Sequence, residues 1–192
     1  VGSFTGERFA EWNGPFRDDV RRFLRGDPDT VRSLATRIEG SPDLYADPGR
    51  EANHSINFVT CHDGFTLQDL VSYVERHNEA NGEDNRDGHA HNLSWNCGEE
   101  GPTEDPEVIA LRRRQRKNFI SLLMLSQGTP MLSMGDELRR SLNGNNNAYS
   151  LEGPAGRLDW SPLDEQCDLT GFIARFIRLT QSFELFREER FW

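Results

Sequence analysis

The sequence Asn57-Phe-Val-Thr-Cys-His-Asp-Gly64 is the stretch that decides the fold of this chain. The apolar and β-branched residues at 56–60 predict a buried strand, which ends at the polar pair His62-Asp63. In parallel α/β architectures, ligands and catalytic groups collect at the carboxyl ends of the strands. The alternative for these residues is a capped helix start, in which Asp63 accepts backbone N–H groups and His62 packs beside it.

Two helices are expected before this strand. Residues 16–25 have apolar side chains at helical spacing, and Gly26 ends that pattern. Residues 28–39 form the second pattern, with Asp27 as the expected N-cap and Gly40 as the terminator. The chain before the strand is therefore expected to be largely helical.

Three further helices are expected after the strand. Thr66, with Asp69 three residues on, is a capping signal that opens the first, and Pro106 opens a longer one over about 106–127 that ends at Gly128. The basic run Arg112-Arg113-Arg114 on this long helix is expected to be a solvated face. The last helix is expected near residues 168–182.

A second short apolar run, residues 129–134, also ends at polar residues, Asp136 and Glu137. Those two acids are expected either to hydrogen-bond at the rim of a barrel or to contact substrate. Strands that alternate with helices imply parallel pairing, but a closed (β/α)8 barrel needs eight strands and about 250 residues. Only two strands are convincing here. We therefore infer that residues 1–192 are the last part of a barrel whose earlier strands lie upstream.

Two polar loops are candidates for function. Residues 77–105 are too long for an ordinary connection in a compact domain, so this loop is expected to be functional or mobile. The amides of the loop 143–147 can donate and accept together, as sugar hydroxyls require, although Asn and Gly also favour simple turns. Trp95 and Trp160 are expected either to stack on sugar rings or to be buried.

Composition excludes several classes of function. The net charge of −10, from 32 acidic and 22 basic residues, disfavours binding to nucleic acid or to an anionic membrane surface. No apolar run approaches the ~18 residues of a membrane span. A neutral partner is therefore expected.

The cysteine and histidine positions predict neither a disulfide framework nor a metal centre. The three cysteines are widely spaced and form no CxxC pair, which indicates a reducing cytoplasm; they are Cys61, Cys97 and Cys167. His77 and the pair His89 and His91 lie in a polar loop, but their spacing fits no standard zinc pattern. We expect no metal ion and no cofactor.

Several segments, taken in order, resemble the glycogen debranching enzymes of the isoamylase type. These enzymes belong to the α-amylase superfamily, glycoside hydrolase family thirteen. The matching segments are Trp12–Phe23, Asn57–Tyr73, His77–Gly88, Asn92–Gly98, Gly101–Pro106, Ser126–Glu137 and Gly144–Tyr149. The resemblance covers roughly residues 9–192. The segments that carry the family's aspartate nucleophile and glutamate acid, on its fourth and fifth strands, do not occur in this sequence.

The resemblance implies an α/β fold in which residues 1–192 are one partial catalytic domain, the carboxyl-terminal part of a (β/α)8 barrel with long loops. Residues 56–60 are then its seventh strand and residues 129–134 its eighth. Asp63 matches the third catalytic carboxylate, which stabilises the transition state, and His62 matches a histidine that hydrogen-bonds the sugar ring. In the loop 143–147, Asn146 and Asn147 are the expected substrate-binding residues.

The implied reaction is hydrolysis of α-1,6 branch linkages by a retaining mechanism, with glycogen, limit dextrin or another branched α-glucan as the substrate. The chain alone is expected to be inactive, because the nucleophile and the acid are not in this sequence. Its expected partner is the missing upstream part of the same polypeptide. A 4-α-glucanotransferase or an α-1,4-glucan hydrolase would share the His-Asp motif. Two other classes are a non-catalytic glucan-binding segment and a His-Asp metal phosphohydrolase, whose His-Asp pair lies on a helix.

Overall fold

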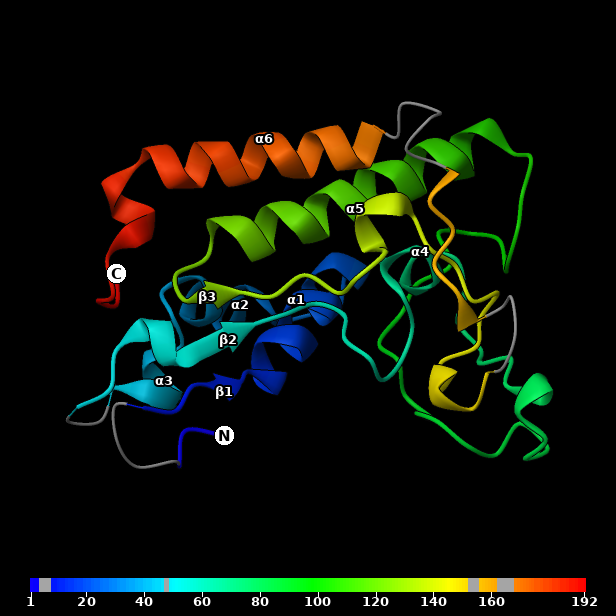
Figure 1. Ribbon diagram of the computed structural model, residues 1–192, viewed down its shortest axis with the longest axis horizontal. Coiled ribbons are helices and arrows are strands. Elements are labelled where there is room, and N and C mark those ends of the chain that lie inside the picture. The colour runs from blue at the N-terminus through cyan, green and yellow to red at the C-terminus, as the bar shows by residue number, and fades with distance from the viewer. Residues whose placement is uncertain (4–7, 47–48, 152–155, 162–167) are drawn as a thin grey trace. The chain divides into compact units, whose positions relative to one another are not determined.

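The structure is a computed structural model that describes residues 1–3, 8–46, 49–151, 156–161 and 168–192 (Figure 1). These residues form two compact units. The first unit comprises Val1–Val59, Asn118–Met131 and Ala174–Trp192, and the second comprises Thr60–Lys117 and Leu132–Ile173. Cys167 lies outside the described residues.

The first unit contains a small parallel sheet (Figure 1). Its strands are β1 (Glu11–Trp12), β2 (Ser55–Asn57) and β3 (Thr129–Pro130), in the order β1-β2-β3. Both pairs are parallel, so the expected parallel arrangement is confirmed. The expectation of two strands is wrong, because β1 is too short to show an alternating pattern in the sequence.

The two expected strands are shorter than the sequence indicated. Pairing of β2 ends at Asn57 and not at residue 60, and pairing of β3 ends at Pro130 and not at residue 134. Proline has no N–H to donate to a ladder. One further bond, from the Met131 N–H to the Asn57 carbonyl at 2.8 Å, follows the last paired residues.

Buried polar side chains fix the central strand. The Asn57 amide donates to the Gln127 carbonyl at 2.9 Å, and the Ser55 hydroxyl donates to Asn57 Oδ1 at 2.8 Å. Asn13, which precedes α1, donates to the Ser55 hydroxyl at 2.8 Å. The side chains of Asn13, Ser55 and Asn57 are fully buried, with no exposed surface. Buried polar groups are stable only when they are paired in this way.

The first helix of this unit confirms the sequence signals, and the second corrects them. Helix α1 (Gly14–Arg25) begins where Asn13 accepts the Phe16 N–H and ends at Gly26, whose φ is 90°. Helix α2 is Val31–Ile38, so the expected start at Pro28 with Asp27 as N-cap is wrong. The Asp27 carboxylate pairs with Arg25 instead, at 2.8 Å.

The remaining helices include one that is shorter than expected. Thr66 caps α4 (Leu67–Leu70) as expected, because its hydroxyl accepts the Asp69 N–H at 3.1 Å, but this helix has a single turn. Helices α5 (Pro106–Leu125) and α6 (Asp168–Ser182) agree with the expected ranges, and α3 is Pro42–Tyr45. Single 3-10 turns occur at Ala52–His54, Glu79–Asn81, Asp136–Leu138, Ala148–Ser150 and Glu184–Arg187.

The expectation of a solvated basic face on α5 is wrong for Arg112. Its side chain is buried, and its guanidinium donates to the carbonyls of Gly101 at 2.6 Å, Asn96 at 3.1 Å and Glu99. Arg113 is exposed and pairs with Asp168 at 2.7 Å. The five donors of one guanidinium thus replace the backbone partners that an irregular loop lacks.

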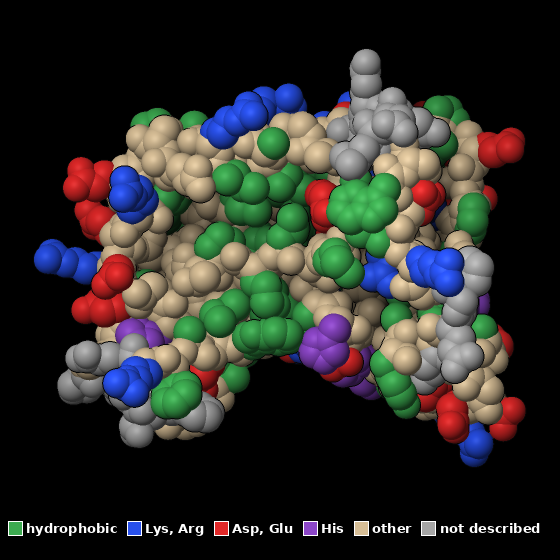
Figure 2. Space-filling model, in the orientation of Figure 1, with side chains coloured by type: hydrophobic (Ala, Val, Ile, Leu, Met, Phe, Trp, Pro, Cys, Tyr) green, Lys and Arg blue, Asp and Glu red, His purple; other side chains and the backbone are tan. Residues whose placement is uncertain are grey.

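The first unit also exposes large apolar side chains. Trp12, Phe183 and Leu185 are 44%, 52% and 51% exposed. Figure 2 shows one face of the molecule, on which hydrophobic side chains gather in patches. Surfaces of this kind normally contact further protein.

Within the described ranges, the helices are too short or too polar to cross a membrane.

Replacement of Gly128 by alanine is expected to destabilise the fold by about 3 kcal/mol or more. The φ of Gly128 is 121°, and an added Cβ would lie 2.7 Å from the Asn57 amide nitrogen and 3.0 Å from the Ser55 carbonyl oxygen. Gly26→Ala is the matched control, because its φ is also positive but nothing lies within 4 Å of the added Cβ. It should cost about 1 kcal/mol. Thermal unfolding of a full-length enzyme that carries each variant tests this, and equal losses would contradict it.

Candidate active site

The His62-Asp63 pair lies in a turn of the second unit and faces solvent. His62 Nε2 is 3.2 Å from Asp63 Oδ2, and the two side chains are 70% and 55% exposed. Gly64 follows with a φ of 88°, a conformation that glycine adopts without strain. The N-cap of the following helix is Thr66 and not Asp63, so the alternative of a capped helix start is wrong for this pair.

The asparagine loop lies directly against this turn. The Gly64 N–H donates to the Asn146 carbonyl at 3.0 Å. The structure therefore brings together the two segments, around residues 62–63 and 146–147, that the sequence indicated as parts of one site.

The Asn146 side chain is buried and uses its hydrogen bonds inside the protein. Its amide nitrogen donates to the His89 carbonyl at 2.8 Å and to Asn92 Oδ1 at 2.9 Å. Its Oδ1 accepts from the Asn78 amide at 2.8 Å, and its backbone N–H donates to Asn78 Oδ1 at 2.9 Å. With 1% of its surface exposed, Asn146 holds the loop 77–105 beside the site.

Asn147 is half-buried and makes a second set of contacts to the same loop. Its amide donates to Asp87 Oδ2 at 2.7 Å, and its carbonyl accepts from the Asn81 amide at 3.0 Å. Hydrogen bonds from Asn81 and then Asn147 hold the pKa of the Asp87 carboxyl below its ordinary value. Asn147 thus helps to hold residues 81–87 of this loop against the asparagine loop.

Two carboxylates near the site are buried, and sequence reasoning gave neither a firm role. Asp136 is 1% exposed and accepts from the Thr60 hydroxyl and, at 2.9 Å, from the Leu67 N–H. Asp69 is fully buried and accepts from the Ser141 hydroxyl at 2.5 Å and the Leu142 N–H at 2.7 Å. Asp69 was visible only as a helix-start signal, because its distant donors leave no local pattern.

Burial raises the pKa of both carboxyls. The pKa of Asp136 rises to about 6, and its hydrogen bonds from Thr60 and Leu67 only partly oppose that effect. The pKa of Asp69 rises for the same reason, opposed by the donors at Ser141 and Leu142. Of the two expected roles for Asp136, hydrogen bonding within the protein is the one that the structure contains.

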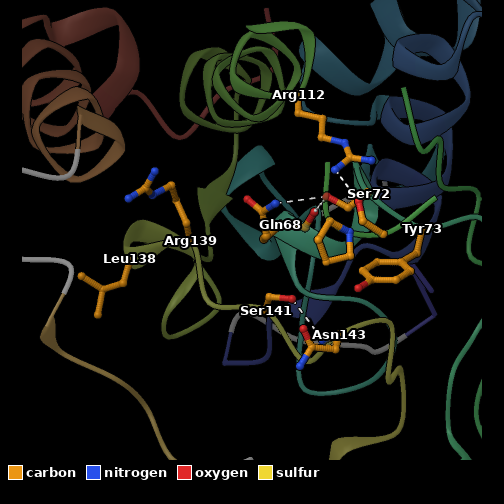
Figure 3. Close-up of a pocket in the computed structure, with 10 residues that line it drawn as sticks. Gln68, Ser72, Tyr73, Arg112, Leu138, Arg139, Ser141 and Asn143 are labelled. Atoms are coloured by element: carbon orange, nitrogen blue, oxygen red, sulfur yellow. Dashed lines mark hydrogen bonds between the residues drawn. The ribbon is translucent and has the colours of Figure 1, made fainter. Parts of the chain in front are cut away.

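A separate cavity of about 390 Å³ lies within the second unit (Figure 3). Its lining combines polar side chains with Tyr73 and Leu138, and the labelled polar residues are Gln68, Ser72, Arg112, Arg139, Ser141 and Asn143. Ser141 links this cavity to the buried Asp69. The four residues expected in the site, His62, Asp63, Asn146 and Asn147, are not part of this lining.

The aromatic candidates differ in exposure. Trp160 is 58% exposed and Trp95 is partly buried, so only Trp160 presents much ring surface to solvent. Tyr149, two residues past the asparagine loop, is 86% exposed. Sequence reasoning did not single it out, although its place beside that loop was a usable signal. Among the described residues, no group of three or more His, Cys, Asp and Glu side chains is arranged to hold a metal ion.

Comparison with known proteins gives close relatives over the whole chain, while no family model matches. The chain is 52% identical to the "Glycogen operon protein GlgX homolog" of Mycobacterium tuberculosis, with 100% of this chain and 26% of that protein aligned. It is 49% identical to "Isoamylase 3, chloroplastic" of Oryza sativa and 48% identical to the "Glycogen debranching enzyme" of Serratia proteamaculans. These two alignments also cover 100% of this chain, with 25% and 29% of the relatives.

Solved structures of pullulanases share the fold. The pullulanase from Bacillus acidopullulyticus matches with a TM-score of 0.63 and 23% identity, over 88% of this chain and 18% of its own. The Anoxybacillus sp. LM18-11 pullulanase complexed with maltotetraose matches with a TM-score of 0.60 and 26% identity, over 90% and 22%. The chain spans about a quarter of the length of the curated relatives that it matches. The resemblance to isoamylase-type debranching enzymes and the partial-barrel fold are confirmed.

Asn146→Asp is expected to destabilise the loop 77–105 by about 2 kcal/mol, because a carboxylate would face the oxygens of His89 and Asn92 without a donor. Asn143→Asp is the matched control, since Asn143 is exposed and its φ of 53° suits aspartate. It should change stability by less than about 0.5 kcal/mol. Limited proteolysis of a full-length enzyme within residues 77–105 measures the difference. Equal cleavage of both variants would argue against this role for Asn146.

Proposed function

We propose that this chain is part of the catalytic barrel of an isoamylase-type glycogen debranching enzyme, which hydrolyses α-1,6 branch linkages with retention of configuration. The observation that carries the proposal is the identity of about half of all residues, over the whole chain, with relatives named as debranching enzymes and isoamylases. The solvent-facing His62-Asp63 pair supports it from the structure. The proposed substrates are glycogen, limit dextrin and other branched α-glucans.

The proposal treats residues 1–192 as one partial catalytic domain. Strands β2 and β3 then take the seventh and eighth places in the barrel. Strand β1 precedes β2 in the sequence and pairs with it, so it takes the sixth place. The partner of this chain is the upstream part of the same polypeptide, and the cysteine content favours a reducing compartment such as the cytoplasm. The rice relative carries "chloroplastic" in its name.

Asp63 is the proposed transition-state stabiliser. A retaining glycosidase uses a nucleophilic carboxylate and a protonated acid about 5–5.5 Å apart across the scissile bond. A third carboxylate lowers the activation free energy of the hydrolysis, because it favours the oxocarbenium-like transition state over the ground state. The exposed Asp63 side chain can approach a sugar in this way once the nucleophile and the acid are supplied upstream.

Of the other three proposed site residues, two are proposed to contact the sugar and one to hold the loop beside it. His62, 70% exposed beside Asp63, is proposed to hydrogen-bond the sugar ring. Asn147, which is half-buried, keeps its proposed contact with substrate. The amide of Asn146 is occupied by His89, Asn92 and Asn78, so we propose a supporting role for it in place of direct contact.

Asp63→Asn in the full-length enzyme is expected to lower kcat by about three orders of magnitude and to leave the fold intact, because the change removes charge and keeps shape. His62→Ala should cost less, about 1 to 3 kcal/mol, since it deletes hydrogen bonds and not the charge. Asp84→Asn, at a carboxylate with 87% of its side chain exposed, is the control and should retain activity. Release of reducing ends from glycogen measures all three. A folded Asp63→Asn enzyme with normal turnover would remove Asp63 from the mechanism.

Residues 1–192 expressed alone are expected to fold poorly and to hydrolyse no glucan. Strands β1 and β3 each have one neighbour in the described sheet, and unpaired strand edges and exposed apolar side chains favour aggregation. The upstream polypeptide should restore solubility and activity together. A monomeric chain 1–192 with a cooperative melting transition and debranching activity would contradict the proposal.

A further inference from the structure

The loop that carries His62 and Asp63 is tied at three points to one other segment of the second unit. At its start, the Thr60 hydroxyl donates to Asp136 Oδ2, and at its end the Leu67 N–H donates to Asp136 Oδ1 at 2.9 Å. Between them, the Gly64 N–H donates to the Asn146 carbonyl at 3.0 Å. One carboxylate therefore joins both ends of the loop 60–67, and a backbone bond fixes its middle.

A second buried carboxylate makes the reverse connection. Asp69 lies just beyond this loop, on α4, and accepts from the Ser141 hydroxyl at 2.5 Å and the Leu142 N–H at 2.7 Å. Asp136 reaches from the segment 136–146 to the loop, and Asp69 reaches from the loop's side back to the segment. Both are at most 1% exposed. In Figure 3, Ser141 also accepts the Asn143 N–H, so the same hydroxyl joins Asp69 to the asparagine loop.

We propose that Asp136 and Asp69 are positioning residues for Asp63: the two buried carboxylates hold the loop 60–67 so that the Asp63 carboxylate has one orientation toward the substrate. This inference rests on the proposed role of Asp63. Neither buried carboxylate is exposed enough to contact a sugar, so both act through the backbone that they hold.

The chemistry of the Asp136 bonds explains how such a clamp can work near neutral pH. A threonine hydroxyl can donate or accept, whereas a backbone N–H can only donate. An ionised Asp136 accepts from both groups. A protonated Asp136 can donate from Oδ2 to the Thr60 oxygen and still accept the Leu67 N–H at Oδ1. Both protonation states keep two bonds, so a pKa of about 6 does not release the loop.

The two hydrogen bonds of Asp136 predict different effects for two substitutions at this position. An asparagine can accept the Leu67 N–H with its oxygen and donate to Thr60 with its amide, as protonated Asp136 does. An alanine can do neither, and it leaves the Leu67 N–H buried without a partner. Asp136→Asn is therefore the conservative variant, and Asp136→Ala is the disruptive one. Thr60→Val removes one bond of the clamp and serves as the milder disruption if Asp136→Ala does not fold.

The test uses a full-length enzyme and measures kcat per folded molecule on a branched glucan. Asp136→Ala or Thr60→Val should lower kcat about tenfold with KM changed less than about threefold, and Asp136→Asn should stay within about threefold of the parent. Asp69→Ala should behave like Asp136→Ala. Asp18→Asn, at a partly exposed carboxylate that pairs with its neighbour Arg17, is the matched control and should not change kcat.

A second arm repeats the disruptive variant in the Asp63→Asn background. If Asp136 acts through Asp63, its loss should lower the residual kcat less than about twofold, because residues that work as a unit are not additive. The inference fails if the tenfold loss recurs in that background, or if folded Asp136→Ala and Thr60→Val enzymes both keep the parent kcat. If Asp63→Asn alone keeps full activity, the proposed role of Asp63 fails first, so the two failures are distinguishable.

Discussion

Hydrogen bonds from side chains to the backbone are the constraint on which the second unit depends. Residues 77–105 contain one 3-10 turn, so most of their N–H and C=O groups have no ladder or helix to pair them. Side chains pair some of these groups instead: Asn78 donates to the Asp87 carbonyl, and Arg112 donates to the carbonyls of Asn96, Glu99 and Gly101. Glu100, within the loop, accepts the N–H groups of Val74 and Glu75 just before it. Without these side chains the loop could not be both long and ordered.

The same constraint explains why asparagine is so frequent around the site. An amide donates and accepts through one planar group, so a single residue can replace two backbone partners. Asn146 does this between three different segments of the second unit. A buried network of this kind is stable only when every member is paired. The amides that look suited to sugar hydroxyls in the sequence are therefore partly used by the protein itself.

The sequence predicted those features that have a local cause. The C-terminal end of α1, the Thr66 cap and the ranges of α5 and α6 follow from residues a few positions apart, and His62-Asp63 stands out because it follows an apolar run. The strand β1 depends on pairing with Ser55 and Ile56, far away in the chain, and the burial of Arg112 depends on carbonyls of the irregular loop before its helix, so no helical or strand pattern contains either. Asp69 shows the limit most clearly, since an acid that opens a helix and an acid that accepts from a distant loop look the same in sequence.

Under the proposed role of Asp63, its exposure and the burial of Asp136 divide the work of the site between them. A carboxylate that still contacts water interacts weakly with a developing positive charge, because the high dielectric screens it. It becomes effective when the surroundings exclude water and hold it in place. This chain supplies the second condition through the ties at Thr60, Gly64 and Leu67. In the proposed enzyme, the first condition is exclusion of water from a side chain that is 55% exposed in this chain, and the substrate and the upstream part of the polypeptide would supply it.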